Sequence, residues 1–582
     1  LFLVPKSNPF LRQLFTYVAG PELDDRVVWI VNDLADVFRA TDVKEIMSDF
    51  GKTTQQNDPF LHFYETFLGE YDQNLRKTKG VYYTPEPVVN FIIRAVDDIL
   101  KNDFKINDGL ADTSKTEIIF EDSGKKIKEK VHKVQILDPA AGTGTFLAEV
   151  VKEIFKKFET QKGMWSRYVE NDLIPRLNGF EILMAPYTMC HLKLDMLLRE
   201  TGYKSKDESK QQRLRVFLTN SLEDAHPETG SLFASWLANE ANEANLVKKE
   251  TPVMVIIGNP PYSVSSMNKS EWIQNLISDY KKDLNEKNIQ PLSDDYIKFI
   301  RFGQHFIDKN GEGILAFISN NSFVDGIIHR QMRKHLLESF DNIYILNLHG
   351  NSRINEFSPD GSVDQNVFDI MQGVSINIFV KKKRKQKKDK FGDVFYFDLF
   401  GKREVKYEIL NSNSFNKIEW KKLKYEAPDY FFVKKNFESK ILYDNYIDMK
   451  SLFIINSIGI VTGNDDEYVA FDKKTIIDKF KNARLFAYRP LDNRFTIFDN
   501  KILQRSRYKV MQNYNYKNFG LNLGRQSKLK GIECLISSDI SCKHFVTGET
   551  YNFPLYIYPE ETKQQNIFSD NVSKTHNFNE KI

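Results

Sequence analysis

Short apolar runs alternate with amphipathic helical stretches between about residues 80 and 380. Runs such as Val253–Ile257 are apolar at every position, which indicates buried strands. The stretches between them, such as Thr145–Phe158 and Asp294–Ile307, repeat apolar residues at helical spacing. This alternation predicts an open, doubly wound α/β sheet, in which ligands bind at the carboxyl ends of the strands. The expected strands are Val134–Ala140, Asn178–Leu183, Val253–Asn259, Gly313–Ser319, Ile343–His349 and Val374–Val380.

The pattern changes on either side of this region. Residues 1–78 show helical spacing, as in Phe60–Tyr71, and we expect helices there that pack their apolar faces into a core. Residues 391–582 consist of short mixed segments rich in Tyr, Phe, Asn and Lys, which predicts a separate α+β domain. Between the two, residues 381–390 hold eight basic residues and one acidic residue, a composition typical of a solvated linker. The predicted divisions are therefore 1–78, 79–380, 381–390 and 391–582.

A glycine-rich turn follows the first expected strand of the sheet. Asp138-Pro139-Ala140-Ala141-Gly142-Thr143-Gly144 leads into a helix, so the backbone can approach a ligand closely and the first helical N–H groups face it. The turn does not match GxxxxGK[ST], which excludes a P-loop. The next strand ends in Glu181, an acid suited to the two hydroxyls of a ribose. Together with Asp138, which could contact a cationic amino-acid group, these residues favour S-adenosylmethionine over a dinucleotide. An ordinary strand–turn–helix corner with a surface glutamate would show the same residues.

A second strand runs directly into Asn259-Pro260-Pro261-Tyr262. The two prolines remove backbone donors and leave carbonyls as acceptors, and Asn259 adds a side-chain oxygen. Such a site suits a planar amino group that donates two hydrogen bonds, to the Asn259 oxygen and the Pro260 carbonyl. These bonds would draw the nitrogen toward tetrahedral geometry, so that its lone pair can attack a methyl group without an ionisable base. Tyr262 offers an aromatic face for stacking.

The net charge of +3, from 82 basic and 79 acidic residues, conceals two unlike parts of the chain. Residues 1–380 are acidic by ten charges, whereas residues 391–582 are basic by six. Lys481–Lys530 alone contains twelve basic residues and two acidic ones, interleaved with aromatic side chains. This pattern is typical of a surface that follows DNA phosphates and contacts bases. Arginine bonds guanine bidentately, and the candidate DNA-binding residues are Arg489, Arg494, Arg505, Arg507 and Arg525.

Several other classes of protein are excluded by composition. The three cysteines form no CxxC, so we expect neither a disulfide framework nor a metal site, and a reducing, cytoplasmic setting. No apolar stretch approaches the ~18 residues that a membrane span needs. The chain begins with Leu1 and shows no signal-peptide pattern, so we expect a fragment or a processed product.

In their order, these motifs resemble those of DNA adenine-N6 methyltransferases in which cofactor motifs precede catalytic motifs and a target-recognition domain follows. The resemblance implies a Rossmann-like methyltransferase sheet, S-adenosyl-L-methionine as cofactor, and an adenine extruded from double-stranded DNA as substrate. Asn259, Pro260, Pro261 and Tyr262 match the catalytic tetrapeptide, and Phe368 would be the second aromatic that stacks on the extruded base. The residues implied to bind the cofactor are Tyr83, Thr84, Asp138, Ala140, Gly142, Gly144, Thr145, Phe146, Glu181, Asn220 and Ser221.

More narrowly, the chain resembles the methyltransferase and recognition portions of single-polypeptide restriction–modification enzymes of types ISP and IIG. Three stretches carry this resemblance: Asp58–Tyr83, Gln365–Val380, and Tyr488-Arg489-Pro490-Leu491-Asp492 together with Phe553-Pro554-Leu555-Tyr556. Such enzymes often carry a nuclease, sometimes with a helicase motor. Neither signature occurs in this sequence, so any such module would precede Leu1, and residues 1–78 would couple it to the methyltransferase.

Three alternatives stay open on the sequence alone. Protein-glutamine methyltransferases share Asn-Pro-Pro-Tyr, because an amide nitrogen poses the same chemical problem, but they are short and lack a large basic carboxyl-terminal domain. Cytosine-N4 methylation is a second possibility, although Ser at the position of Asn259 is more typical of it. The third is a non-catalytic DNA-specificity or anti-phage scaffold on a vestigial methyltransferase fold, against which the intact set of Asp138, Glu181 and Asn259–Tyr262 argues.

Overall fold

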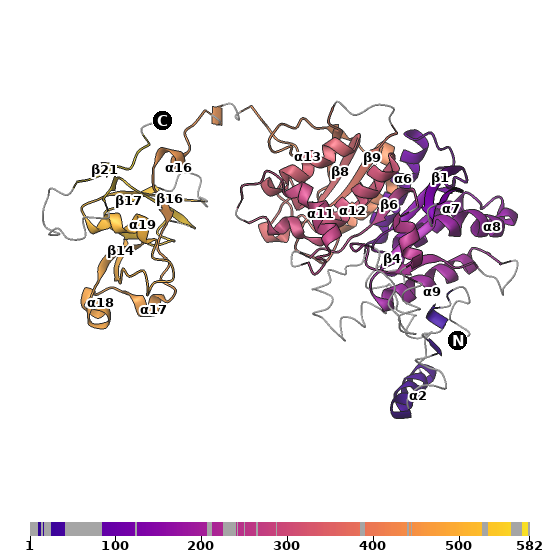
Figure 1. Ribbon diagram of the computed structural model, residues 1–582, viewed down its shortest axis with the longest axis horizontal. Helices are drawn as coiled ribbons and strands as arrows, with labels where there is room; N and C mark the ends of the chain where they lie inside the picture. Colours follow the sequence, from indigo (N-terminus) through magenta and orange to yellow (C-terminus); the bar gives the residue numbers. More distant parts are fainter. Residues whose placement is uncertain are drawn as a thin grey trace. The chain divides into compact units, whose positions relative to one another are not determined.

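The computed structural model divides the chain into two compact units, Leu1–Lys435 and Asn436–Ile582, which are described separately (Figure 1). The structure describes residues 8, 10–12, 15–16, 25–40, 84–122, 125–205, 212–224, 240, 242–249, 251–263, 266–286, 288–383, 390–438, 442–443, 445–525, 534–546, 548–559 and 573–579. The predicted helix Phe60–Tyr71 lies outside these residues. Within the predicted coupler, the structure describes helix α2 (Asp25–Ala40).

A nine-stranded sheet forms the centre of the first unit. Its strand order is β11-β10-β8-β9-β7-β6-β3-β4-β5. Most neighbours are parallel, but β9 runs antiparallel to both β7 and β8, and β11 runs antiparallel to β10. The bounds are β3 (Gln135–Asp138), β4 (Leu177–Glu181), β5 (Arg215–Leu218), β6 (Val253–Gly258), β7 (Gly313–Asn320), β8 (Asn342–His349), β9 (Val374–Lys381), β10 (Asp393–Asp398) and β11 (Lys421–Lys422).

Successive side chains of the central strands are buried on opposite faces of the sheet. Ile136 joins the core on one face and its neighbour Leu137 the core on the other, and Val255 and Ile256 divide in the same way. This explains why a run such as Val253–Ile257 is apolar at every position rather than at alternate ones. Helices cover both faces, so the predicted doubly wound α/β fold is confirmed.

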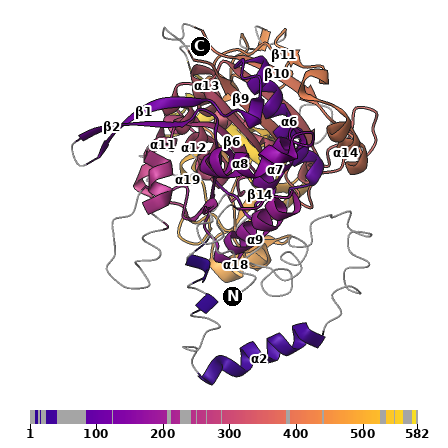
Figure 2. The same cartoon turned by 90° about the vertical axis from the view of Figure 1, so that its right-hand side faces the viewer.

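The two helical layers contain different segments of the chain. One core includes residues of α6 (Glu86–Asn102), α7 (Thr145–Lys156) and α9 (Met184–Glu200), and the other includes residues of α11 (Glu271–Lys281), α12 (Asp295–Asn310) and α13 (Arg330–Ser339). Six of the sheet's strands lie where the sequence places them, whereas β5, β10 and β11 were not predicted. The hairpin of β1 (Lys115–Asp122) and β2 (Lys125–His132), also unpredicted, projects from this unit (Figure 2).

The central sheet extends beyond the boundary predicted at residues 381–390. Strand β10 pairs in parallel with β8 along its whole length, from Asp393 opposite Asn342 to Asp398 opposite Asn347. The helix after it, α14 (Arg403–Ser412), packs against α6. The two compact units divide at Lys435, because the segment 391–435 completes an edge of the first unit's sheet.

The second unit is built on two small four-stranded sheets. Their orders are β12-β19-β16-β17 and β13-β15-β14-β18. The bounds are β12 (Ser457–Ile458), β13 (Val469–Ala470), β14 (Arg484–Arg489), β15 (Asp492–Thr496), β16 (Gly520–Gly524), β17 (Cys534–Ser537), β18 (Ile540–Ser541) and β19 (Thr550–Pro554), with helices α16 (Met449–Leu452), α17 (Asp465–Tyr468), α18 (Lys473–Phe480) and α19 (Tyr508–Met511). No helix in the described parts of the chain is long and apolar enough to cross a membrane.

Candidate cofactor and catalytic site

The glycine-rich turn connects the carboxyl end of β3 to the amino end of α7. Gly142 and Gly144 both adopt positive φ, 54° and 82°, a backbone region that side chains with a Cβ disfavour. A Cβ on Gly142 would meet nothing within 4 Å, whereas one on Gly144 would lie 2.6 Å from the Cys190 sulfur. The turn is therefore open on the Gly142 side and tightly packed beneath Gly144. Phe146 buries its ring in the core below the turn.

Asp138 is buried at the end of β3 with one carboxylate oxygen engaged. Its Oδ1 accepts a hydrogen bond from the Ala140 N–H (3.1 Å), while its Oδ2 is buried without a protein partner. Gly258 approaches the same carboxylate so closely that a Cβ there would lie 2.9 Å from Oδ1. Burial, aided by the charge of Glu181, raises the pKa of Asp138 to about 8. A cationic ligand group reaching Oδ2 would satisfy the orphaned atom and favour the charged carboxylate.

Glu181, at the end of β4, links its own strand to the glycine turn. Its Oε2 accepts from the Gly142 N–H (2.9 Å), and its Oε1 accepts from the N–H groups of Ile182 (2.9 Å) and Leu183 (2.7 Å). Burial raises the pKa of Glu181, and these three backbone donors oppose that rise. A carboxylate oxygen can accept more than one hydrogen bond, so ligand hydroxyls could be accepted beside these backbone groups.

The turn Asn220–Ser221 lies beside the same sheet edge and is held by a lysine that the sequence did not single out. Ser221 Oγ donates to the Pro139 carbonyl, which ties this turn to the glycine turn. Lys248 Nζ donates to the Asn220 carbonyl (2.7 Å), and burial lowers the pKa of Lys248 to about 8. Lys248 falls in a run of charged residues, so its sequence carries no signal that distinguishes it from a surface lysine.

The orientation of the Asn259 amide is fixed from both ends. Its Nδ2 donates to Thr84 Oγ1 (3.0 Å), and its Oδ1 accepts from the Tyr262 hydroxyl (2.8 Å). Thr84 is buried two residues before the start of α6, so residues 175 positions apart meet at this amide. The next residue, Pro260, is buried, and Pro261 is half-buried. The amide oxygen is thereby directed as an acceptor.

Tyr262 is half-buried among aromatic and acidic neighbours. Its ring meets that of Tyr296 edge to face, with centroids 6.2 Å apart. Burial raises the pKa of Tyr262, and the charge of Asp294 adds to that rise, so the phenol stays protonated. Asp294 accepts from the Ser263 N–H (2.8 Å), which fixes the loop that follows Tyr262. The ring is therefore positioned by its surroundings rather than by ionisation.

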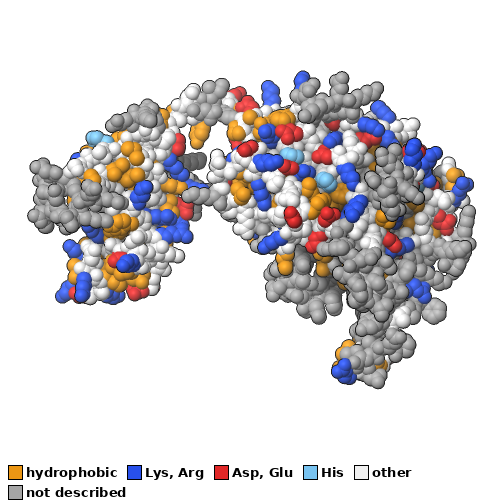
Figure 3. Space-filling model, viewed as in Figure 1, with side chains coloured by type: hydrophobic (Ala, Val, Ile, Leu, Met, Phe, Trp, Pro, Cys, Tyr) orange, Lys and Arg blue, Asp and Glu red, His pale blue; other side chains and the backbone are white. Residues whose placement is uncertain are grey.

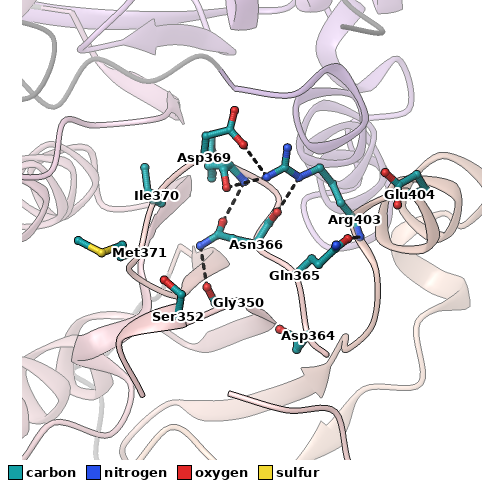
Figure 4. A pocket seen from close by; sticks show the side chains of 11 residues that line it. Gly350, Ser352, Asp364, Gln365, Asn366, Asp369, Ile370, Met371, Arg403 and Glu404 are labelled. Atoms are coloured by element: carbon teal, nitrogen blue, oxygen red, sulfur yellow. Dashed lines mark hydrogen bonds and ion pairs between the residues drawn. The ribbon is translucent and has the colours of Figure 1, made fainter. Parts of the chain in front are cut away.

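Phe368 lies between β8 and β9 and lines a hollow of about 560 Å³; other residues that line this hollow are shown in Figure 4. The ring is 4% exposed and belongs to the buried cluster against which Tyr262 packs. The hollow is otherwise lined mainly by polar groups: Gly350, Ser352, Asp364, Gln365, Asn366, Asp369, Ile370, Met371, Arg403 and Glu404.

The first unit therefore brings most of the predicted site residues to one edge of the sheet. Asp138, Glu181 and the Asn259 loop follow β3, β4 and β6, which are neighbours or next neighbours in the sheet. Thr145 is the first residue of α7. Ala140 belongs to the glycine-rich turn and donates its N–H to Asp138, and Ser221 donates to the Pro139 carbonyl of the same turn. Tyr83 lies outside the described residues. Among the residues that are described, no group of three His, Cys, Asp or Glu side chains is arranged to hold a metal ion.

The predicted DNA-binding arginines lie in the second unit, and Lys and Arg side chains recur across its visible surface (Figure 3). The guanidinium groups of Arg489 and Arg494 both lie over the ring of half-buried Tyr488, 4.1 and 4.3 Å from its centroid. Arg494 also pairs with Asp492 (2.9 Å), and Arg525 with Glu549 (3.0 Å). Arg505 is exposed, whereas Arg507 is half-buried at the start of α19.

Two family models match the chain. Residues 55–351 match the model described as N-6 DNA Methylase, and residues 471–582 match the Type ISP C-terminal specificity domain. The predicted resemblance, and its order of methyltransferase before specificity domain, is thereby confirmed. Methyltransferases of the first family generally use S-adenosylmethionine.

Curated relatives cover parts of the chain. The type II methyltransferase M.BstVI of Geobacillus stearothermophilus is 23% identical over 245 residues, which are 40% of this chain and 37% of that protein. A putative type II restriction enzyme and methyltransferase of Methanocaldococcus jannaschii, RM.MjaORFECS2P, is 32% identical over 129 residues, 19% of this chain and 11% of that protein. The chain thus matches well under half the length of each.

The fold of nearly the whole chain also resembles part of a solved protein. The ATP-dependent Type ISP restriction-modification enzyme LlaBIII, solved bound to DNA, superposes with a TM-score of 0.68 at 21% identity. The match covers 98% of this chain and 42% of that one. At this identity the likeness establishes the fold.

Proposed function

The chain belongs to the N-6 DNA methylase family, and we propose that it transfers a methyl group from S-adenosylmethionine to N6 of an adenine extruded from double-stranded DNA. The observation that carries this proposal is the orientation of Asn259. Because Nδ2 donates to Thr84 Oγ1, the amide is oriented with Oδ1 as its acceptor, the atom to which we propose that a substrate amino group donates. The Tyr262 hydroxyl now occupies one side of that oxygen, and an amide oxygen has a second lone pair.

The chemistry we propose is positioning and electrostatics. The adenine amino group donates one hydrogen bond to Asn259 Oδ1 and the other to the Pro260 carbonyl. Both acceptors draw the nitrogen out of conjugation with the ring, which makes its lone pair nucleophilic. Neither Pro260 nor Pro261 has an N–H, so no backbone donor of these two residues competes for those acceptors. Tyr262 and Phe368 stack on the extruded base.

The residues at the end of β3 fit S-adenosylmethionine, which when bound supplies an electrophilic methyl group. Asp138 holds a buried, unpartnered Oδ2 where a cationic amino-acid group can be accepted. Gly142 leaves open space above the turn, and Glu181 lies where ribose hydroxyls can be accepted. The remaining residues proposed to line this site are Thr84, Ala140, Gly144, Asn220 and Ser221.

The second unit is proposed to bind the DNA duplex and to read its sequence. The match to a Type ISP specificity domain over residues 471–582 supports this, as does the excess of basic residues in 481–530. We further propose that the chain acts within a restriction–modification system in the cytoplasm. Because it spans 42% of the LlaBIII chain, nuclease or helicase modules in the same polypeptide are part of this proposal.

The proposal is tested by methyl transfer from labelled S-adenosylmethionine to DNA that lacks host methylation. Asn259→Ala should abolish methyl transfer, since removing one such group costs on the order of 10²–10³ in rate. The affinity for the cofactor should stay within about twofold of the wild-type value, because Asn259 acts on the base. Asn275→Ala, on the exposed side of α11, is the matched control and should retain full activity. If the wild-type protein binds the cofactor but transfers no methyl group, the proposed function is refuted. If Asn259→Ala loses the cofactor instead, Asn259 has another role.

A further inference from the structure

Helix α14 binds the backbone of the Phe368 loop at four successive residues. Each carbonyl from residue 365 to residue 368 accepts a hydrogen bond from a side chain of this helix. The donors lie at positions i, i+3 and i+4, which share one helical face. The four bonds are Lys406 Nζ to Gln365 O (2.6 Å), Arg403 Nε to Asn366 O (2.7 Å), Tyr407 hydroxyl to Val367 O (2.7 Å) and Arg403 Nη2 to Phe368 O (3.0 Å).

The lysine in this set is completely buried. Besides Gln365 O, its ammonium donates to the Leu348 carbonyl (2.7 Å) and lies 2.9 Å from Asp364 Oδ1, and neither charged side chain is exposed. All three ammonium protons therefore have partners. A buried ion pair contributes little net stability, because desolvation offsets the attraction. Its effect here is to allow one arrangement of the loop and to exclude others.

Arg403 adds contacts on the rim of the hollow. Its Nη2 also pairs with Asp369 Oδ1 (2.7 Å), the residue after Phe368 (Figure 4). Its backbone N–H donates to Gln365 Oε1 (3.0 Å). Within the loop, the Phe368 N–H donates to Asn366 Oδ1 (2.9 Å). The backbone on both sides of Phe368 is thereby held, so the Cα–Cβ direction of Phe368 is set by α14.

The same helix is attached to the element that orients Asn259. Arg94 of α6 donates to the last carbonyls of α14, at Leu410 (2.6 Å) and Asn411 (3.2 Å). Helix α6 begins two residues after Thr84, which accepts from Asn259. A continuous set of contacts therefore connects the loop that carries Asn259 with the loop that carries Phe368.

We propose that Arg403, Lys406 and Tyr407 are positioning residues that set the Phe368 ring as one wall of the base-receiving site. This inference rests on the proposed function, since it concerns how the extruded adenine is held. It gives the segment after residue 391 a role in the methyltransferase site, through a helix that lies outside the residues matched by either family model. Loss of these contacts lets the loop move and leaves the base without its second stacking partner.

Two variants test this while keeping the fold. Tyr407→Phe removes a single hydroxyl, and Arg403→Ala, at a half-exposed site, removes two hydrogen bonds to loop carbonyls and the ion pair with Asp369. Their matched controls are Ser412→Ala, an exposed α14 hydroxyl, and Lys402→Ala, an exposed neighbouring cation. Each protein is assayed on a duplex that contains its methylation sequence, as found by sequencing the methylated DNA of an expressing host. The target adenine is replaced by 2-aminopurine for the fluorescence measurement.

We expect kcat to fall roughly 2- to 10-fold in Tyr407→Phe and about 10- to 100-fold in Arg403→Ala, as for the loss of one or two hydrogen bonds that act in the transition state. The 2-aminopurine signal at saturating DNA should change in the same order, and KM for the cofactor should stay constant. Both controls should match the wild type. A loss of thermal stability without any change in kcat or fluorescence would show a purely structural role and overturn the proposal. If the wild type itself transfers no methyl group, the proposed function fails first and this inference with it.

Discussion

Thr84→Val is the sharpest test of how the amide of Asn259, the proposed catalytic group, is oriented. The substitution keeps the shape of the buried side chain and removes the one atom, Oγ1, that accepts from Asn259 Nδ2 at 3.0 Å. A neutral hydrogen bond of this kind contributes about 0.5–1.5 kcal/mol. If it acts in the transition state, its loss slows methyl transfer by about 2- to 13-fold, since 1.36 kcal/mol corresponds to a factor of ten.

The rate should be measured in a single turnover, with S-adenosylmethionine and DNA both saturating. Under these conditions a weaker affinity for the cofactor does not affect the result, which matters because Thr84 is also a predicted cofactor contact. Thr84→Ser keeps the accepting oxygen and should retain a rate close to that of the wild type. An unchanged rate in Thr84→Val would refute the reasoning. A change confined to KM for the cofactor would assign Thr84 to cofactor binding instead.

Three further outcomes follow from the structure. Because the pKa of Asp138 is raised to about 8, a cationic cofactor group that binds at lower pH must displace the proton of this carboxyl group. Calorimetry should therefore show that cofactor affinity rises between about pH 6 and 8 more steeply in the wild type than in Asp138→Asn. Equal slopes would contradict the contact between Asp138 and the cofactor. The Cβ of Gly144→Ala would overlap the Cys190 sulfur, whereas Gly142→Ala adds only a backbone cost of about 1 kcal/mol at positive φ. Gly144→Ala should therefore lower the thermal midpoint of unfolding more than Gly142→Ala does. The reverse order would contradict the packing described for this turn. Affinity for duplex DNA should fall steeply with salt, and Arg505→Ala should reduce the logarithmic slope by about one; a flat response would remove the second unit from the DNA interface.

The parts of the site that follow buried strands could be predicted from the sequence. Asp138 and Glu181 end their strands and Asn259 directly follows its strand, and parallel strands bring such positions together at one end of the sheet. The glycines of the turn carry their own signal, since two of them adopt positive φ. Local pattern and tertiary position agree at these residues.

The contacts that orient these residues could not be predicted. Thr84 meets Asn259 across 175 positions, and Arg403 reaches the Phe368 loop from a helix after β10. The family resemblance implies Thr84 as a cofactor contact and not as a partner of Asn259, and Arg403 is not distinguishable by type or spacing from a surface residue. The domain boundary expected at residues 381–390 placed β10 outside the first unit, although β10 pairs with β8. A run of basic residues indicates exposure to solvent and does not mark the end of a sheet. Strand β5 (Arg215–Leu218) was also not predicted.

The central claim is that this chain methylates adenine N6 in DNA through Asn259. The most direct measurement is the identity of the modified base in DNA from a host that lacks adenine methylation and expresses either the wild-type chain or Asn259→Ala. Mass spectrometry of the nucleosides, with sequencing of the modified positions, should find N6-methyladenine within one short sequence for the wild type and none for the variant. N4-methylcytosine, or no methylated base from a protein that binds S-adenosylmethionine, would contradict the claim.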